Sequence, residues 1–188
     1  MRVKIKNYMK RILISIVLFI AGFTAGAETI SHSKDFANQI DSSQLYCLTQ
    51  NVYFEAGNQS LEGMAAVADV TLNRVQEDRY PNTICEVVKQ GVKHPNGTMK
   101  RNKCQFSWYC DGKSDRVPNI ENNQIWRDAE FVAKAMLLEY NMTEEGNYFG
   151  ITCGSTHYHA NYVVPAWIDD AGMNRTKQIG KHIFYKFW

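Results

Sequence analysis

The chain has 188 residues, of which 45% are apolar and 12% aromatic, and its formal net charge is +2. The first 27 residues hold five basic and no acidic side chains, so the remainder has 16 basic against 19 acidic residues, a net charge of −3. This composition is typical of a globular protein and excludes a disordered, collagen-like or coiled-coil chain. The acidic balance of the remainder also argues against nucleic acid as a partner.

The N-terminal segment has the layout of a secretory signal peptide. A basic stretch precedes an apolar run over residues 12–20, and Ala25-Gly26-Ala27 supplies small residues in the A-x-A pattern. The apolar run is short for a bilayer-spanning helix, which needs about 20 residues, so an uncleaved anchor is the weaker interpretation. We predict a signal peptide over residues 1–27, no stable membrane span after its cleavage, and export to the periplasm, cell envelope or exterior.

Export determines how the cysteines are interpreted, because disulfides form and persist outside the cytosol. Five cysteines allow at most two intramolecular bridges and leave one thiol, and their spacing selects no pairing. A bridge between Cys104 and Cys110 would close a short loop. Zinc is a weaker interpretation because no C-x-x-C pair occurs. The disulfide candidates are Cys47, Cys85, Cys104, Cys110 and Cys153.

Residues 28–41 are polar and weakly patterned, and we predict that they form a linker to one domain over residues 42–188. The domain opens with two helices. The first is predicted from N-cap candidates at Asp41 to a C-cap at Gly57, and the second over residues 61–76, because apolar side chains recur in both at helical spacing.

Further along, a short third helix is predicted to start at residues 81–83 and to end near Gly91. Residues 92–121 show little periodicity and are predicted to form a long functional loop. A fourth helix is predicted over residues 122–140 and a strand over residues 183–188. The inward side chains predicted for the fourth helix are Ile125, Ala129, Val132, Met136 and Tyr140.

The most informative stretch surrounds Glu55, which lies two residues before the predicted end of the first helix. The negative end of the helix dipole and the neighbouring aromatic side chains both disfavour a charged carboxylate, so we expect a raised pKa for Glu55. A carboxylic acid that keeps its proton near neutral pH can protonate a leaving alkoxide. The alternative from spacing alone is a solvated surface glutamate.

A family resemblance favours the catalytic interpretation. Residues 53–60, Tyr-Phe-Glu-Ala-Gly-Asn-Gln-Ser, resemble the Y-x-E-A-R-G-E-S signature of SleB-type cell wall hydrolases. This chain has Gly57-Asn58 where the family has Arg-Gly, and Gln59 where it has Glu, which alters local pairing or substrate contacts. The resemblance continues in order through residues 63–68, 72–75, 80–88, 104–108 and 179–185, and spans about residues 45–188.

The resemblance implies a mainly α (α+β) fold: a lysozyme-like helical domain with long loops and a small β element. It also implies cleavage of peptidoglycan glycan strands with Glu55 as the acid/base, in the manner of a lytic transglycosylase and without a cofactor. A muramidase would need a second carboxylate. The candidates for that second acid are Asp69, Asp111, Asp115, Asp169 and Asp170.

Aromatic rings and hydrogen-bonding side chains are typical of sugar-binding grooves. The predicted substrate-binding residues are Tyr53, Gln105, Phe106, Ser107, Trp108, Tyr158, His159 and Trp167. From composition alone, residues 105–109 would serve equally well as a disulfide-closed loop that packs its rings. Asn73 and Arg74, late on the second helix, are predicted to be structural and to hydrogen-bond the first helix or the loop below it.

Two further features have simpler interpretations. Zinc bound by His157, His159 and His182 with Asp169 is disfavoured because no H-E-x-x-H motif occurs, so no metal is predicted. A basic run before Cys104 indicates a solvated loop or, less readily, a contact with an anionic envelope polymer. That run comprises Lys93, His94, Lys100, Arg101 and Lys103.

Two other functions remain open at the level of sequence. A Cys/His peptidase or amidase would pair one cysteine with His157 or His159 and cut the peptide stem. A non-catalytic peptidoglycan-binding module would bind glycan strands without releasing product. Whichever of these functions holds, we expect the protein to be a monomer.

Overall fold

The computed structural model describes residues 40–144 and 147–187. The predicted signal peptide, and all of the predicted linker up to residue 39, lie outside the described residues. The part from Ile40 onward forms one compact unit. It contains four α-helices and two small sheets among its described residues, so the predicted mainly α (α+β) class is confirmed. None of its described helices has the length and apolar character needed to cross a membrane.

The helices begin where polar side chains cap them. Asp41 accepts from the backbone N–H of Ser43 at 2.7 Å and starts α3, Ser42–Ala56. Ser60 caps α4, Leu61–Val75, and Thr83 caps the short α5, Ile84–Val88. Asn123 caps α6, Gln124–Met142. Each cap satisfies N–H groups that the first helical turn leaves unpaired, and these starts agree with the predicted helices within a few residues.

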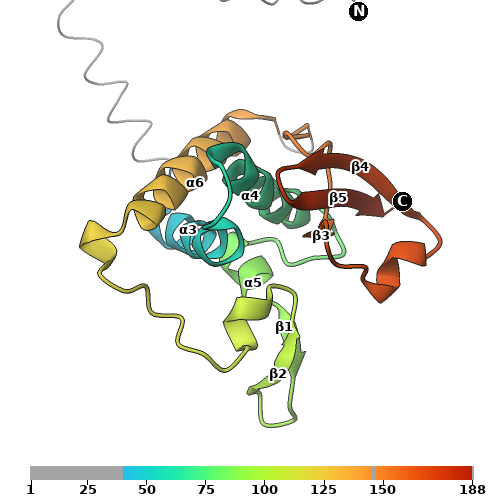
Figure 1. Cartoon of the computed structure of the whole chain (residues 1–188), viewed down its shortest axis with the longest axis horizontal. Helices are drawn as coiled ribbons and strands as arrows, with labels where there is room; N and C mark the ends of the chain where they lie inside the picture. Colours follow the sequence, from blue (N-terminus) through green and yellow to red (C-terminus); the bar gives the residue numbers. More distant parts are fainter. Residues whose placement is uncertain (1–39, 145–146, 188) are drawn as a thin grey trace, which may run out of the picture. The chain divides into compact units, whose positions relative to one another are not determined.

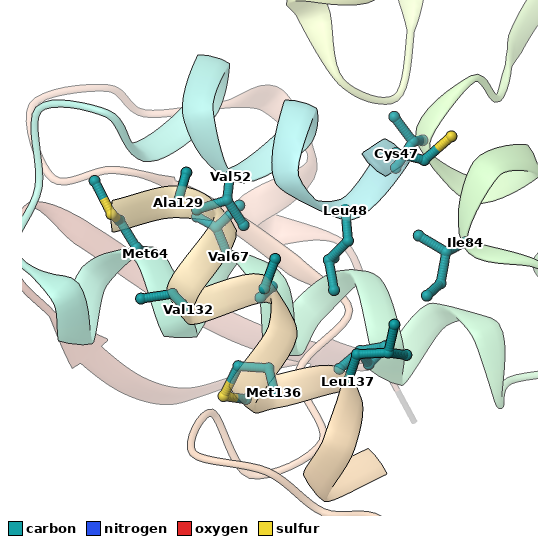
Figure 2. Packing of buried hydrophobic residues seen from close by; sticks show 14 of the residues in the cluster. Cys47, Leu48, Val52, Met64, Val67, Ile84, Ala129, Val132, Met136 and Leu137 are labelled. Carbon is teal, nitrogen blue, oxygen red and sulfur yellow. The ribbon is translucent and has the colours of Figure 1, made fainter. Parts of the chain in front are cut away.

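The three long helices pack against one another around the main hydrophobic core (Figure 1). Leu48 and Val52 from α3 lie close to Val67 from α4 and Val132 from α6 (Figure 2). Ile125 was predicted to face inward in α6, but it is 42% exposed, whereas its neighbour Trp126 is 7% exposed. The prediction was wrong because the buried face of α6 begins one residue later.

Residues 92–121 are not one irregular loop. Strands β1, Gly91–Lys93, and β2, Met99–Cys104, pair as an antiparallel hairpin beside α5 (Figure 1). Short 3-10 turns, η1 at Ser107–Cys110 and η2 at Ile120–Asn122, follow. The hairpin is largely exposed and carries the basic residues of the run before Cys104, so it lacks the apolar alternation by which half-buried strands are identified.

The second sheet has three antiparallel strands in the order β3–β5–β4. They are β3, His157–Ala160, β4, Met173–Ile179, and β5, His182–Phe187, with η3, Ala166–Asp169, between the first two. Only the last strand was predicted. One face of the sheet packs on α4, where Phe184 meets Ala66 and Val70. This face lies beside the end of α3, and it therefore positions the candidate site.

Two disulfides are present and one cysteine is free among the described residues. Cys47 of α3 is bonded to Cys85 of α5, and Cys104 is bonded to Cys110 around the loop that leads into η1. Cys153 is the free thiol. The first bridge fixes the start of α3 to α5, and the second closes the loop containing Gln105 and Ser107.

Candidate active site

Glu55 lies in the last turn of α3, and its side chain is half-buried. The hydroxyl of Tyr158, from β3, donates a hydrogen bond to Glu55 Oε2 at 3.0 Å. The backbone N–H of Ser107, from η1, also hydrogen-bonds to the carboxyl group. Three segments that are far apart in the sequence therefore meet at one carboxyl group.

The pKa of Glu55 is set by opposing effects. Burial raises it above the usual glutamate value, as the sequence led us to expect. The hydrogen bond from Tyr158, the positive charge of Arg74 and the hydrogen bond from Ser107 each favour the ionised form and limit the rise. The site thus favours a protonated acid and also contains groups that can stabilise the carboxylate once the proton has left.

Arg74 is almost completely buried behind this carboxyl group, with 4% of its surface exposed. Its Nε donates to the carbonyl oxygen of Thr156 at 2.8 Å. Its guanidinium carbon lies 5.2 Å from the ring centre of Tyr80 and 4.9 Å from that of Phe106. The planar cation is therefore held against two aromatic rings.

Asn73, beside Arg74, also bonds the segment that precedes β3. Its Nδ2 donates to the carbonyl oxygen of Ser155 at 3.0 Å and to Thr152 Oγ1 at 3.3 Å. The structure confirms buried hydrogen-bonding roles for both residues. Of the predicted partners, the first helix is not used, because the bonds go to the loop over residues 152–156.

Strand β3 sends its side chains to opposite faces of the sheet. Tyr158 faces Glu55, and its ring centre lies 5.0 Å from that of His182. His159 packs instead on Tyr185, 5.3 Å between ring centres, and Trp167 packs edge-on against His159. Because strand residues alternate between faces, the predicted substrate residues His159 and Trp167 form a separate cluster from Glu55 and Tyr158.

The loop over residues 105–108 divides its side chains in a similar way. Gln105 and Ser107 are exposed, whereas Phe106 is 2% and Trp108 is 8% exposed. The Trp108 ring stacks on Phe54 at 4.6 Å, and its Nε1 donates to Asn51 Oδ1 at 3.0 Å. The prediction of sugar-stacking rings at Phe106 and Trp108 is corrected here, because both rings are part of the core.

Tyr53, another predicted substrate residue, is half-buried between α3 and α6. Its hydroxyl accepts from Asn123 Nδ2 at 3.2 Å, and its ring centre lies 5.9 Å from that of Trp126. These contacts give Tyr53 a packing role at the start of α6.

Asp69, one of the candidates for a second acid, is fully buried. Its carboxylate accepts from the Tyr148 hydroxyl at 2.5 Å and from the Thr152 backbone N–H at 2.8 Å. Asp69 anchors the segment after α6 and offers no exposed oxygen to a substrate. It therefore does not fit the role of a second catalytic acid. Asp111 accepts from the Lys113 backbone N–H in an exposed turn, and Asp169 and Asp170 are exposed.

His157 and His159 are each bonded to a neighbouring hydroxyl. His157 Nδ1 lies 2.9 Å from Thr156 Oγ1, and His159 Nε2 lies 3.1 Å from the Tyr185 hydroxyl. Burial, followed by the charges of Arg74 and Arg79, lowers the pKa of His157 to about 4. Across the described part of the chain, no cluster of three His, Cys, Asp or Glu side chains could hold a metal ion.

Two of the residues that depart from the family signature bond each other. Gln59 Nε2 donates to Asn58 Oδ1 at 2.6 Å, and Gln59 Oε1 accepts from the backbone N–H of Lys181 at 3.3 Å. Gln59 therefore connects the turn after α3 to the β4–β5 turn.

Comparison with known proteins identifies the family. Residues 58–185 match the Cell Wall Hydrolase family, and the chain belongs to it. The matched range begins after Glu55. A curated relative, the spore cortex-lytic enzyme of Bacillus subtilis (strain 168), is 26% identical over 143 residues. That match covers 76% of this chain but only 37% of the relative, so the chain spans well under half of that protein.

Two solved structures share the fold. The catalytic domain of the Bacillus cereus SleB protein is 25% identical, with a TM-score of 0.50 over 79% of this chain and 94% of that one. The catalytic domain of the germination-specific lytic transglycosylase SleB from Bacillus anthracis is 24% identical, with a TM-score of 0.50 over 79% of this chain and 98% of that one. The resemblance to SleB-type hydrolases is therefore confirmed.

Proposed function

We propose that this chain cleaves the β-1,4 bond between N-acetylmuramic acid and N-acetylglucosamine in peptidoglycan, as a lytic transglycosylase with Glu55 as its acid/base. The observation that carries the proposal is the half-buried Glu55 carboxyl, whose pKa is raised by burial while Tyr158 donates to one of its oxygens. Membership of the cell wall hydrolase family supports the substrate, and the similar fold of the Bacillus anthracis domain, which is a lytic transglycosylase, supports the reaction.

The proposed reaction uses one carboxyl group twice. Because Tyr158 donates to Oε2, the acidic proton belongs on Oε1. That proton goes to the glycosidic oxygen as the bond to C1 of N-acetylmuramic acid breaks, and N-acetylglucosamine leaves with a free hydroxyl. The Glu55 carboxylate then takes the proton of the C6 hydroxyl while that oxygen bonds to C1. A 1,6-anhydro ring forms, no water is consumed, and Glu55 regains its proton.

The surroundings of Glu55 favour this mechanism over that of a muramidase. Two-carboxylate glycosidases place the second group about 5 Å away for retention and further for inversion. Among the described residues, the groups that perturb the pKa of Glu55 are Tyr158, Arg74 and Ser107, and none is a carboxylate. A single acid that alternates between donor and acceptor needs the balance of burial and anion-stabilising groups found here.

Polar contacts to the glycan are proposed for Gln105 and Ser107. Both are exposed on the disulfide-closed loop whose Ser107 N–H reaches Glu55. An amide and a hydroxyl beside the acid could bind the acetamido and hydroxyl groups of the sugars. Export is part of the same proposal, since both disulfides suit an oxidising compartment outside the cytosol, where peptidoglycan lies.

Replacement of the proposed acid tests the function. We expect Glu55→Gln to abolish release of soluble muropeptides from purified sacculi while its circular dichroism stays that of the wild type. Glu62→Gln is the matched control, because Glu62 is exposed in the first turn of α4, and it should keep full activity. Release of muropeptides by Glu55→Gln at the wild-type rate would reject the assignment.

The two other functions give different results in the same assay. A cysteine peptidase would lose activity when Cys153 is alkylated, whereas glycan cleavage should be indifferent to the blocker. The described residues give that peptidase little support, because His157 and His159 bond Thr156 and Tyr185 and neither is hydrogen-bonded to Cys153. A binding module would bind sacculi without releasing muropeptides, both as the wild type and as Glu55→Gln.

A further inference from the structure

Arg74 is a buried cation without an ion pair. Its side chain is 4% exposed, and within the described part of the chain its Nη1 has no hydrogen-bond partner and the recorded salt bridges involve other residues. Burying an uncompensated charge costs on the order of several kcal/mol of folding free energy. The two ring faces beside it supply part of that compensation. The remaining cost of burying the Arg74 charge would be offset by an anion that forms only during the reaction.

Arg74 also connects the two segments that donate hydrogen bonds to Glu55. Its Nε holds the carbonyl oxygen of Thr156, two residues before Tyr158. Its guanidinium lies over the ring of Phe106, the residue before Ser107. Tyr158 and Ser107 are the groups that hydrogen-bond the carboxyl of Glu55. A displacement of Arg74 would therefore disturb both donors together.

We propose that Arg74 is a positioning residue for Glu55: its guanidinium fixes the two donor segments and supplies the positive charge that balances the Glu55 carboxylate after proton transfer. The inference rests on the proposed function and deepens it. While Glu55 is protonated, Arg74 lacks a counter-ion. When Glu55 ionises during the reaction, each charge compensates the other, which lowers the energy of the state that must form.

The charged and titratable groups around this pair are few. Tyr158 from β3 and Arg74 from α4 face Glu55, together with the Ser107 N–H. Arg74 is faced by Tyr80, Tyr158, Glu55 and Glu77. Glu77 already forms an ion pair with Arg79, so Glu55 is the acid whose charge Arg74 can balance during the reaction. His157, with its lowered pKa of about 4, is neutral above that pH.

The test separates charge from hydrogen bonding with two variants of the full chain. Two quantities are measured. The first is the rate of muropeptide release per folded protein, and the second is the midpoint of the alkaline limb of the pH–rate profile, the pH at which the rate has fallen to half its maximum. Arg74→Gln keeps an amide donor but loses the charge, so this midpoint should rise by about one pH unit and the rate should fall at least about tenfold. Arg74→Lys keeps the charge but loses the planar fork, so its midpoint should stay while the rate falls about tenfold.

Arg116→Gln is the matched control, since Arg116 is exposed in the loop that follows η1, and it should change neither quantity. An unmoved midpoint in Arg74→Gln, or an undiminished rate in Arg74→Lys, would overturn the inference. If circular dichroism shows that Arg74→Gln does not fold, Arg74→Lys alone tests the proposal. A shifted midpoint or a wild-type rate in Arg74→Lys would then contradict it. Glu55→Gln is measured in the same assay. Activity in Glu55→Gln would reject the proposed function itself. If Glu55→Gln is inactive but Arg74→Gln keeps the wild-type rate and midpoint, only the role of Arg74 is rejected.

Discussion

At the scale of single residues, the site depends on one carboxyl group under two opposing influences. Loss of water favours the neutral form of Glu55, while Tyr158, Arg74 and Ser107 favour its anion. A general acid is most effective when its pKa lies near the working pH, because it must hold a proton and also release it. Burial alone would make the proton too hard to remove, and the three polar groups alone would leave no proton to give.

Removing the Tyr158 hydroxyl tests this balance. A hydrogen bond to the charged form lowers a pKa, so Tyr158→Phe should raise the pKa of Glu55 further. The acid then stays protonated to higher pH, and the alkaline limb of the pH–rate profile should move upward. The maximal rate should fall about tenfold, because the proton is no longer directed to Oε1.

The profile is measured by muropeptide release across a pH series. Tyr162→Phe serves as the control, because the Tyr162 side chain is 79% exposed, and its profile should match the wild type. A Tyr158→Phe profile that overlays the wild type in both position and height would contradict the role given to this hydroxyl.

Sequence reasoning singled out Glu55 as the candidate acid and named Tyr158 and Ser107 as substrate-binding residues, but it did not show that both hydrogen-bond Glu55. The residues next to it in the chain indicated a raised pKa, because helix position and aromatic neighbours are local information. Its partner Tyr158 is 103 residues away, and no local pattern shows that β3 turns this ring toward α3. For the same reason His159 was grouped with Tyr158, although strand alternation places it on the other face.

At the scale of elements, the helices were predictable and most of the strands were not. Helices α3 and α4 carry their signals locally, in capping side chains such as Asp41 and Ser60 and in a regular apolar spacing. Strands β1 and β2 are exposed and polar, and β4 is mostly exposed as well. A periodicity search does not detect these strands, because they lack the alternation of buried apolar and exposed polar side chains that marks a half-buried strand.

Gly150 tests how the segment after α6 is held against α4. Its backbone is in the left-handed region, φ +57°, and a Cβ at this position would overlap the Asp69 carboxylate. Gly150→Ala should therefore lower the free energy of unfolding by about 3 kcal/mol or more, since it adds a collision to the backbone strain. The measurement is the midpoint of urea denaturation.

Gly97 is the matched control for that experiment. Its φ is also positive, +84°, but a Cβ there would meet no atom within 4 Å. Gly97→Ala should cost only the backbone strain, about 1 kcal/mol. Equal losses in the two variants would show that the packing of Gly150 on Asp69 does not hold this segment in place.

At the scale of the whole molecule, the compact unit from Ile40 onward brings the end of α3, the disulfide-closed loop and β3 to one carboxyl group. The Cys47–Cys85 bridge fixes the start of α3, and Asp69 and Arg74 hold the segment that leads into β3. The N-terminal pattern, the length and the cysteine number predicted one exported domain with at most two bridges and one thiol left over. The pairing itself required the three-dimensional arrangement.

The most direct test of the central claim is mass spectrometry of the muropeptides that the full-length chain releases from purified sacculi. A single acid that closes the C6 hydroxyl onto C1 predicts N-acetylmuramic acid ends in the 1,6-anhydro form, each lighter by one water than a hydrolysed end, and none with Glu55→Gln. Reducing ends that incorporate oxygen from labelled water would contradict the account, because they would show that water, and not the sugar's own hydroxyl, attacks the bond.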